Sequence, residues 1–450
     1  MHRSALGLFT SLMLAAPALA QEEIPPPVIS EFTLDNGMQL VVMPDTRAPI
    51  VTHTVWYRVG AADEPPGQSG VAHFLEHLMF RGTETYPAGA LDRLVSELGG
   101  NMNAFTSWDV TAYFETIPPD ALGEIMAIEA DRMRNVALPP EIIDAERAVV
   151  MEERRQVIES NPDGILAEEL AATQFQNHPY GSPVIGWAHE IEELSRDDAL
   201  SFYNQYYAPN NALVVVAGDV EPEAVRALAE QTYGAVPRGP DLPERVRPQE
   251  PPQDTSRTVT LTDPRVALPS FTRGWVVPSY RTGAAGEAEA LDVLAGLLSD
   301  GTRSILYQKL VVELGIAAQA NASYDGAAFD MGTFTLSGAP RPDATLEELI
   351  AAISAEIEDI ITNGVSQEDV DRVADRFARD TVFQRDDPTH LAMSYGLWLA
   401  NGGTIEGLNT WPDRIRAVTP QAVQDVAARY LGADNAVTGY LLPPAEEPAP

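Results

Sequence analysis

Hydrophobic and polar positions alternate in some segments of the chain and recur with helical spacing in others. Alternation rich in β-branched and aromatic residues predicts strands, and Asn36-Gly37 marks a turn between the first two apolar runs. The predicted strand regions of the first half are residues 31–45, 50–63, 101–117 and 212–220. Helical spacing begins at Ser69 and returns at residues 120–135, 141–160 and 164–175.

The same order of elements returns after a proline-rich stretch. Residues 236–254 contain six prolines among many charges, which excludes regular structure and predicts an interdomain linker. Beyond it, residues 268–280 and 317–339 resemble strands, and residues 286–299 and 345–364 have helical spacing. We therefore expect an α+β fold of two similar α/β domains. The predicted divisions are a domain at 31–236, a linker at 237–256, a homologous domain at 257–442 and an acidic, Pro-rich tail at 443–450.

The first 20 residues are typical of a secretory signal peptide. They combine a basic start at Arg3, an apolar run and a small-residue cleavage site at Ala18-Leu19-Ala20. The alternative is a membrane anchor, but the run is short for a spanning helix. We expect cleavage after residue 20 and an exported protein, periplasmic if the source is a bacterium, with no integral membrane segment afterwards.

Composition restricts the chemistry and the partners. The chain has no cysteine, which excludes thiol catalysis and thiolate metal sites. Its formal net charge of −37 argues against nucleic acid and anionic lipid as partners. This charge would attract basic peptides, or it simply keeps the surface soluble.

One polar cluster is embedded in an apolar helical stretch. His73 and His77 are four residues apart, so they share a helix face, and Glu76 lies beside them. Two imidazoles with an oxygen ligand suit a catalytic Zn²⁺ that keeps one position open for water. A neighbouring carboxylate can then take the proton of that water, and we assign this role to Glu76. The alternative is that the histidines are ordinary helix residues.

A third protein ligand must come from elsewhere in the chain. Glu146 and Glu153 are two helical turns apart on one predicted face, which also carries Val149, Val150 and Val157. We choose Glu153 as the ligand and Glu146 as the residue that orients a histidine. Spacing alone leaves Glu146 or Glu152 as alternative ligands. We expect His178 and His189 to lie outside the metal site, as exposed loop residues.

The segments "HFLEHLMFRGT" and "ERAVVMEE" together resemble the pitrilysin-type zinc peptidases, or inverzincins, which carry H-x-x-E-H. The family places a glutamate ligand about 75 residues after the second histidine, and 75 residues separate His77 from Glu153 here. "GGNMNAFTSWDVTAYF" resembles the substrate-binding edge strand of the family, with Asn103 and Ala104 at matching positions, and "HPYGSPVIGW" is another family-like stretch. The resemblance implies one Zn²⁺ per chain and two domains forming half of a clamshell around peptides.

The second half departs from the family pattern. "SILYQKLVVELGIAA" aligns with a stretch that in the family carries an Arg and a Tyr near bound substrate, but this chain has Val311 and Ala318 there. This departure predicts a heterodimer in which a homologous second chain supplies the Arg and Tyr. The alternatives are a self-sufficient homodimeric peptidase and a non-catalytic peptide-binding or assembly subunit.

Overall fold

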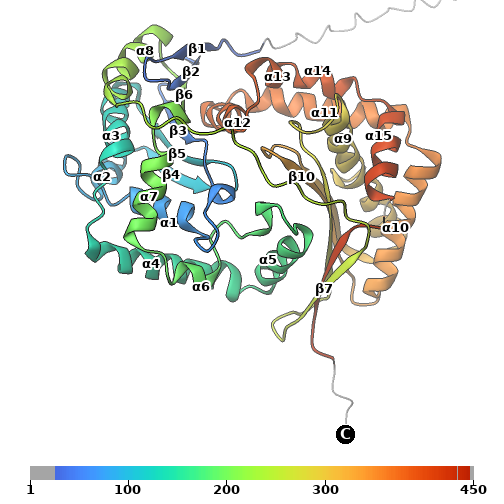
Figure 1. Ribbon diagram of the computed structural model, residues 1–450. Coiled ribbons are helices and arrows are strands. Elements are labelled where there is room, and N and C mark those ends of the chain that lie inside the picture. Colours follow the sequence, from blue (N-terminus) through green and yellow to red (C-terminus); the bar gives the residue numbers. More distant parts are fainter. Residues whose placement is uncertain (1–25, 433, 446–450) are drawn as a thin grey trace, which may run out of the picture.

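The first half of the chain folds around a six-stranded sheet. The computed structural model describes residues 26–432 and 434–445, so the predicted signal peptide lies outside the described residues (Figure 1). The strand order is β1-β2-β6-β3-β5-β4; β2 and β6 run parallel, and the other neighbouring strands are antiparallel. The strands are β1 (Ser30–Thr33), β2 (Gln39–Pro44), β3 (Val51–Tyr57), β4 (Asn101–Thr106), β5 (Thr111–Ile117) and β6 (Ala212–Gly218).

Residues 101–117 form two strands, whereas a single strand was predicted. The chain reverses between β4 and β5, where the Ser107 N–H donates to the Val110 carbonyl at 2.8 Å. Both strands carry the same alternating pattern, so hydrophobicity alone does not reveal the turn. As a result, β4 lies at the edge of the sheet and pairs only with β5 among the described strands.

The second half repeats this topology. Its five strands lie in the order β7-β11-β8-β10-β9, which matches β2-β6-β3-β5-β4 strand for strand, including the one parallel pair. The prediction of two similar halves in an α+β fold is therefore confirmed. The strands are β7 (Arg257–Thr262), β8 (Ser270–Pro278), β9 (Ala317–Asp325), β10 (Met331–Pro340) and β11 (Val437–Leu442).

Helices cover the sheets, and the predicted helical stretches are confirmed to within a few residues. The first half contains α1 (Val71–Met79), α2 (Ala90–Glu97), α3 (Leu122–Asn135), α4 (Pro140–Arg154), α5 (Pro162–Gln174), α6 (Ala188–Ile191), α7 (Arg196–Tyr206) and α8 (Pro222–Gln231). The second half contains α9 (Glu287–Ser299), α10 (Leu346–Asn363), α11 (Gln367–Gln384), α12 (Pro388–Ala400), α13 (Ile405–Asn409), α14 (Trp411–Arg416) and α15 (Pro420–Val426). No described helix combines the length and apolar character needed to span a bilayer.

The two halves exchange one helix each (Figure 1). Helix α12 of the second half packs on β3 and β6 of the first sheet, and α5 of the first half packs on β7, β8 and β11 of the second. The fit is tight, because a Cβ at Gly396 on α12 would lie 2.1 Å from the fully buried Trp56 indole. Each sheet thus depends on the other half to cover one face.

The segment between the halves has no helix or strand from 236 to 256, yet it is held firmly. Arg247 donates to Asp63 at 2.7 Å and to Asp109 at 2.9 Å; Arg247 and Asp109 are buried, and Asp63 is partly buried. Arg245 also pairs with Asp63, and both guanidinium groups lie over the ring of Phe329 in the second half. This segment therefore clamps the halves together instead of tethering them loosely. The proposed domain boundaries stay a prediction.

Candidate metal centre

Helix α1 carries the histidine pair at a position set by a close backbone contact. The helix begins after Gly70, whose φ of 86° lies in the left-handed region. A Cβ at Gly70 would lie 2.5 Å from the Ile185 carbonyl oxygen, so glycine is required there on both grounds. This contact seats the first turn of α1 against the loop that follows α5.

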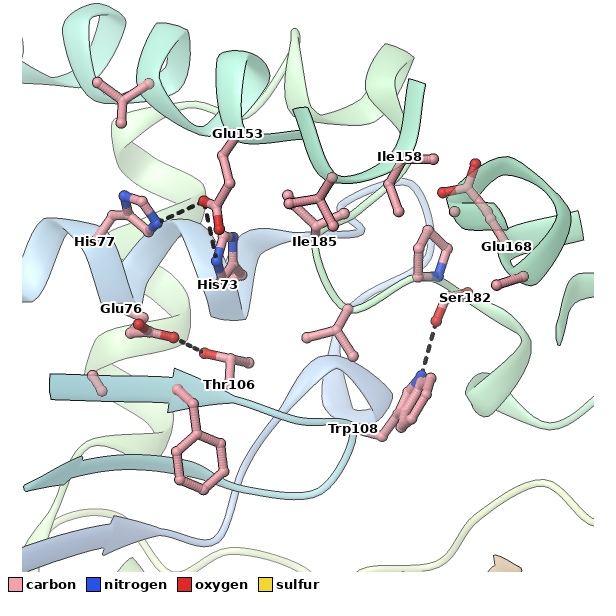
Figure 2. Close-up of a pocket in the computed structure, with 18 of the residues that line it drawn as sticks. His73, Glu76, His77, Thr106, Trp108, Glu153, Ile158, Glu168, Ser182 and Ile185 are labelled. Atoms are coloured by element: carbon pink, nitrogen blue, oxygen red, sulfur yellow. Dashed lines mark hydrogen bonds and ion pairs between the residues drawn. The ribbon is translucent and has the colours of Figure 1, made fainter. Parts of the chain in front are cut away.

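Glu153, at the end of α4, faces both histidines. Its Oε2 lies 3.2 Å from His77 Nε2 and 3.6 Å from His73 Nε2. Figure 2 shows Glu153 reaching from its helix toward the two imidazoles of α1. One ligand atom from each of these three residues lies within 4.8 Å of the others, and no other such group of three occurs among the described residues.

The electrostatics of the three groups fit a metal ion. Burial, with the neighbouring His77, lowers the pKa of His73 to about 3, so its imidazole is neutral and able to coordinate. Glu153 Oε2 is buried without a hydrogen-bond donor among the described residues, although it faces the histidines. A buried carboxylate oxygen without a donor is costly, and a cation would satisfy it. Two imidazole nitrogens and a carboxylate oxygen are a donor set that suits Zn²⁺.

Glu146 holds His77 from the side away from Glu153. His77 Nδ1 donates to Glu146 Oε1 at 3.0 Å, which leaves Nε2 free toward the cluster. Arg81, one helical turn after His77, donates to the other oxygen of Glu146, and Glu146 is 2% exposed. Burial raises the pKa of Glu146, but the hydrogen bonds from His77 and Arg81 outweigh it and lower that pKa overall.

The same contacts act on His77. Burial lowers its pKa, but the hydrogen bond to Glu146 and the carboxylates of Glu153 and Glu76 outweigh burial, so its pKa is raised in the metal-free protein. A bound metal would compete with a proton for His77 Nε2, the nitrogen that faces Glu153.

Glu76 is separate from the three-residue group. It lies on the strand-facing side of α1, where Thr106 of β4 donates to its Oε2 at 2.6 Å (Figure 2). Burial raises the pKa of Glu76, although the Thr106 hydrogen bond opposes this shift. A carboxylate that is 8% exposed, held by one hydroxyl and outside the ligand group, is suited to accept a proton.

A cavity of about 1240 Å³ opens beside these residues. Asn103 and Ala104 line it from β4, whose free edge could pair with another strand. Across the cavity lies α5, tied to α4 by the Arg154–Glu168 ion pair at 2.7 Å. The remaining wall residues are mainly apolar and include Phe105, Trp108, Val157, Ile158, Val184 and Ile185.

The structure corrects part of the reasoning about α4. Val150 is buried, but Val149 and Val157 are 47% and 52% exposed and line the cavity, so Glu146 and Glu153 do not share a buried apolar stripe with them. The helix ends at Arg154 and continues as a π-helical turn, Arg155–Glu159, which rotates the following side chains. Glu152 pairs with Arg155 on the surface and is not in the group.

His178 and His189 both lie outside the group, but only His189 is exposed, and it lies in the short helix α6 instead of a loop. His178 is 3% exposed instead, with Nε2 at 3.4 Å from Asp330 of the second half, so it belongs to the contact between the halves. Sequence reasoning also missed Thr106 and Arg81. Arg81 could have been noticed because it follows His77 by four residues, whereas Thr106 contacts Glu76 only through the fold.

Comparisons with known proteins assign the chain to a family of peptidases. The family description "Insulinase (Peptidase family M16)" matches residues 40–187, and "Peptidase M16 inactive domain" matches residues 193–377. The two matches define the class of protein: a two-domain fold of the peptidase type. Its first half carries the histidine–carboxylate cluster described above. The chain belongs to peptidase family M16, and the resemblance to the pitrilysin-type peptidases is confirmed.

Individual relatives support the same placement. A zinc protease, PqqE, from Helicobacter pylori is 29% identical over 97% of this chain and 98% of its own length. A probable mitochondrial-processing peptidase subunit beta from Arabidopsis thaliana is 25% identical over 89% of this chain and 75% of its own. The crystal structure of a protease from Helicobacter pylori, 29% identical, matches with a TM-score of 0.85 over 93% of this chain and 100% of that one.

Proposed function

We propose that this chain is a zinc-dependent endopeptidase that hydrolyses unstructured peptides, with Zn²⁺ held by His73, His77 and Glu153. The observation that carries the proposal is that one potential ligand atom from each of these three residues lies close to the other two. In addition, the buried Glu153 Oε2 accepts no hydrogen bond from the described residues. Family membership and relatives named zinc proteases support it.

Each polar neighbour has a defined task in this proposal. Zinc, when bound, would polarise the scissile carbonyl and make an attacking water more acidic. Glu76 takes the proton of that water and later gives it to the departing amine. Thr106 fixes the carboxylate of Glu76, and Glu146 keeps the proton of His77 on Nδ1 so that Nε2 stays available.

Substrate binding would use the edge strand β4. A peptide in extended form can add to a free sheet edge through main-chain hydrogen bonds, and Asn103 and Ala104 lie there beside the cavity. The substrate would therefore have to be unfolded around the cleavage site, because only an extended segment can pair with β4 in this way.

A partner chain is part of the proposal. The side chains of Val311 and Ala318 carry no hydrogen-bond donor for a developing oxyanion, so a homologous second chain would supply the Arg and Tyr in a heterodimer. A self-sufficient homodimer and a non-catalytic peptide-binding subunit are the competing assignments. The predicted export to the periplasm also stays a proposal.

Zinc content and peptide cleavage, measured on the same samples, test the assignment. Glu76→Gln should keep about one zinc per chain and lose roughly 10²–10⁴-fold in turnover, the usual contribution of a general base. Glu152→Gln is the matched control, because Glu152 lies on the surface outside the cluster. Loss of zinc together with turnover in Glu76→Gln would mean that base and ligand have been confused.

The need for a partner is tested by assaying the chain alone and then with a homologous chain that carries the Arg and Tyr. Low activity alone and a large increase in the mixture are expected. Full activity of the purified chain would refute the heterodimer. Zinc-loaded protein that binds peptide but cleaves none in either assay would favour the non-catalytic assignment.

A further inference from the structure

The first turn of α1 has no capping side chain of its own. Gly70 stands at the N-cap and has no side chain, and Val71 and Ala72 follow it. The N–H groups at the start of a helix have no partner within the helix and need acceptors from elsewhere. The placement of this turn matters for the metal centre, because His73 follows Ala72 directly and is one of the proposed ligands.

Glu64 supplies these acceptors from the loop before the helix. The Gly70 N–H donates to Glu64 Oε2 at 2.9 Å, and the Ala72 N–H donates to Glu64 Oε1 at 2.9 Å. One carboxylate thus joins two N–H groups of the same turn, with both of its oxygens in use. Because a pair of contacts resists rotation and a single contact does not, this arrangement fixes the orientation of the helix as well as its position.

A second carboxylate holds the residue before this turn. The Ser69 N–H donates to Glu190 Oε2 at 2.6 Å, and the Ser69 hydroxyl accepts from the Trp187 N–H at 2.9 Å. Glu190 belongs to α6 and Trp187 is its N-cap residue. The start of α1 is therefore bound by two separate segments, and negative charge there also interacts favourably with the positive end of the helix dipole.

The same contacts act on the charge of Glu64. Burial, together with the charges of Asp63 and Glu190, raises the pKa of Glu64. The two N–H groups oppose this shift, because they favour the ionised form. The first turn of α1 thus helps to keep the carboxylate in the form that can accept from both N–H groups.

The second half provides an internal comparison. Helix α9 is the counterpart of α1: both begin after a glycine with left-handed φ, Gly70 and Gly286, but α9 carries none of the proposed metal ligands. The loop before α9, residues 279–286, contains no acidic residue. No carboxylate among the described residues accepts from an N–H of the first turn of α9. A helix of this kind therefore forms without such a contact, and the contact occurs where ligands have to be placed.

We propose that Glu64 is a positioning residue of the metal centre, which sets the orientation of α1 and thereby the direction of His73 Nε2. This inference rests on the proposed zinc site. No hydrogen bond or ion pair joins Glu64 to His73 in the described structure, so Glu64 acts through the backbone of the helix. His73 Nε2 lies 3.6 Å from Glu153 Oε2, and a rotation of α1 would change this distance because Glu153 is on another helix.

Zinc affinity of the chain without its predicted signal peptide, measured at pH 8 by competition with a chelator, tests the proposal. Glu64→Gln keeps the size of the side chain but places an amide donor opposite one of the two N–H groups. We expect roughly tenfold weaker zinc binding, the lower end of the range for residues that orient a metal ligand. Glu193→Gln, which changes an exposed glutamate just after α6, is the matched control and should leave zinc affinity unchanged.

Cobalt spectroscopy separates positioning from a loss of stability. Co²⁺ in the site reports the geometry of its ligands through visible absorption, so Glu64→Gln should change the absorption bands at saturating Co²⁺. Leu294→Ala removes a fully buried side chain of α9 and lowers stability in the second half. It should leave zinc affinity and the Co²⁺ bands as in the wild type.

If Glu64→Gln does not fold, Glu64→Asp provides a second test. It keeps the charge but is one methylene shorter, so it should show the same two changes to a smaller extent. Wild-type zinc affinity and wild-type Co²⁺ bands in the folded Glu64 variant would overturn the role of Glu64 while leaving the zinc site in place. An equal loss of zinc affinity in Leu294→Ala would also overturn it, because stability alone would then explain the effect. A wild-type chain that binds no zinc would refute the metal centre itself, and this inference with it.

Discussion

Replacing Thr106 by valine tests how much the placement of Glu76 matters for turnover. Thr106 Oγ1 donates to Glu76 Oε2 at 2.6 Å, and it is the hydrogen bond that the described structure provides to this 8%-exposed carboxylate. Valine has nearly the same shape but no hydroxyl, so the change removes one interaction and little packing.

We expect kcat on an unstructured peptide to fall by roughly 10- to 100-fold. A hydrogen bond to a charged group contributes about 1.5–3 kcal/mol, and ~1.4 kcal/mol in the barrier corresponds to a tenfold change in rate. The full contribution of the bond would be added to the activation free energy if the bond is needed to orient the Glu76 carboxylate. A smaller part would be added if a water molecule replaces the hydroxyl. KM should change little, because Thr106 acts on the base and not on the peptide.

The pH dependence of kcat has a defined direction. Burial raises the pKa of Glu76 and the Thr106 hydrogen bond lowers it, because the bond favours the ionised form. Without the hydroxyl, the pKa rises further and the acidic limb of the pH–rate profile moves to higher pH. Bound zinc acts on Glu76 in both proteins, so the difference between the two profiles isolates the hydroxyl.

Two controls make the test decisive. Thr106→Ser restores a hydroxyl and should recover most of kcat and the original acidic limb. Zinc content should be the same in all three proteins, because Thr106 contacts none of the proposed ligands. Wild-type kcat and an unmoved acidic limb in Thr106→Val would refute the role given to this hydrogen bond.

Three further changes probe the ligands and the packing between the halves. Glu153→Gln should weaken zinc binding strongly in a chelator competition, and unchanged zinc retention would move the ligand to another glutamate. Glu146→Gln should weaken zinc binding by roughly 10- to 100-fold, as for other residues that orient a ligand, and an effect as large as that of Glu153→Gln would make it a ligand. Gly396→Val should lower the free energy of unfolding, measured by urea titration, by about 1–3 kcal/mol or more, because the valine side chain would overlap the Trp56 indole. Gly234→Val is the control and should lower it much less, because a Cβ there meets its neighbours at ordinary contact distances.

The helices and strands were largely predictable because their causes are local. The alternating and helical patterns placed α3, α4 and α5 within two residues of their start points, apart from the π-helical end of α4. The pairing of His73 with His77 is also local, since four residues of helix bring them together. The turn inside residues 101–117 was missed because β4 and β5 present one continuous alternation.

The third ligand shows where local reasoning ends. Glu146, Glu152 and Glu153 lie on one helix, and nothing in their spacing says which side of α4 meets α1. The family spacing indicated Glu153, and in the structure Glu153 faces the histidines while Glu146 reaches His77 from the other side. The difference arises from how α4 crosses α1, which is a property of tertiary packing.

The exchanged helices have a consequence for the cavity. Helix α5 forms one wall of it through residues such as Asp163, Ala167 and Ala171, but Leu166 and Leu170 on the other face of α5 pack on β11 near Gly439. Gly439 is a point of close approach, since a Cβ there would lie 3.0 Å from Leu170. The second half thus supplies the surface on which a wall of the first half's cavity rests. The described part of the second half contributes none of the three proposed metal ligands, but it supports the cavity, because the first sheet and its helices alone would leave one face of α5 without a packing partner.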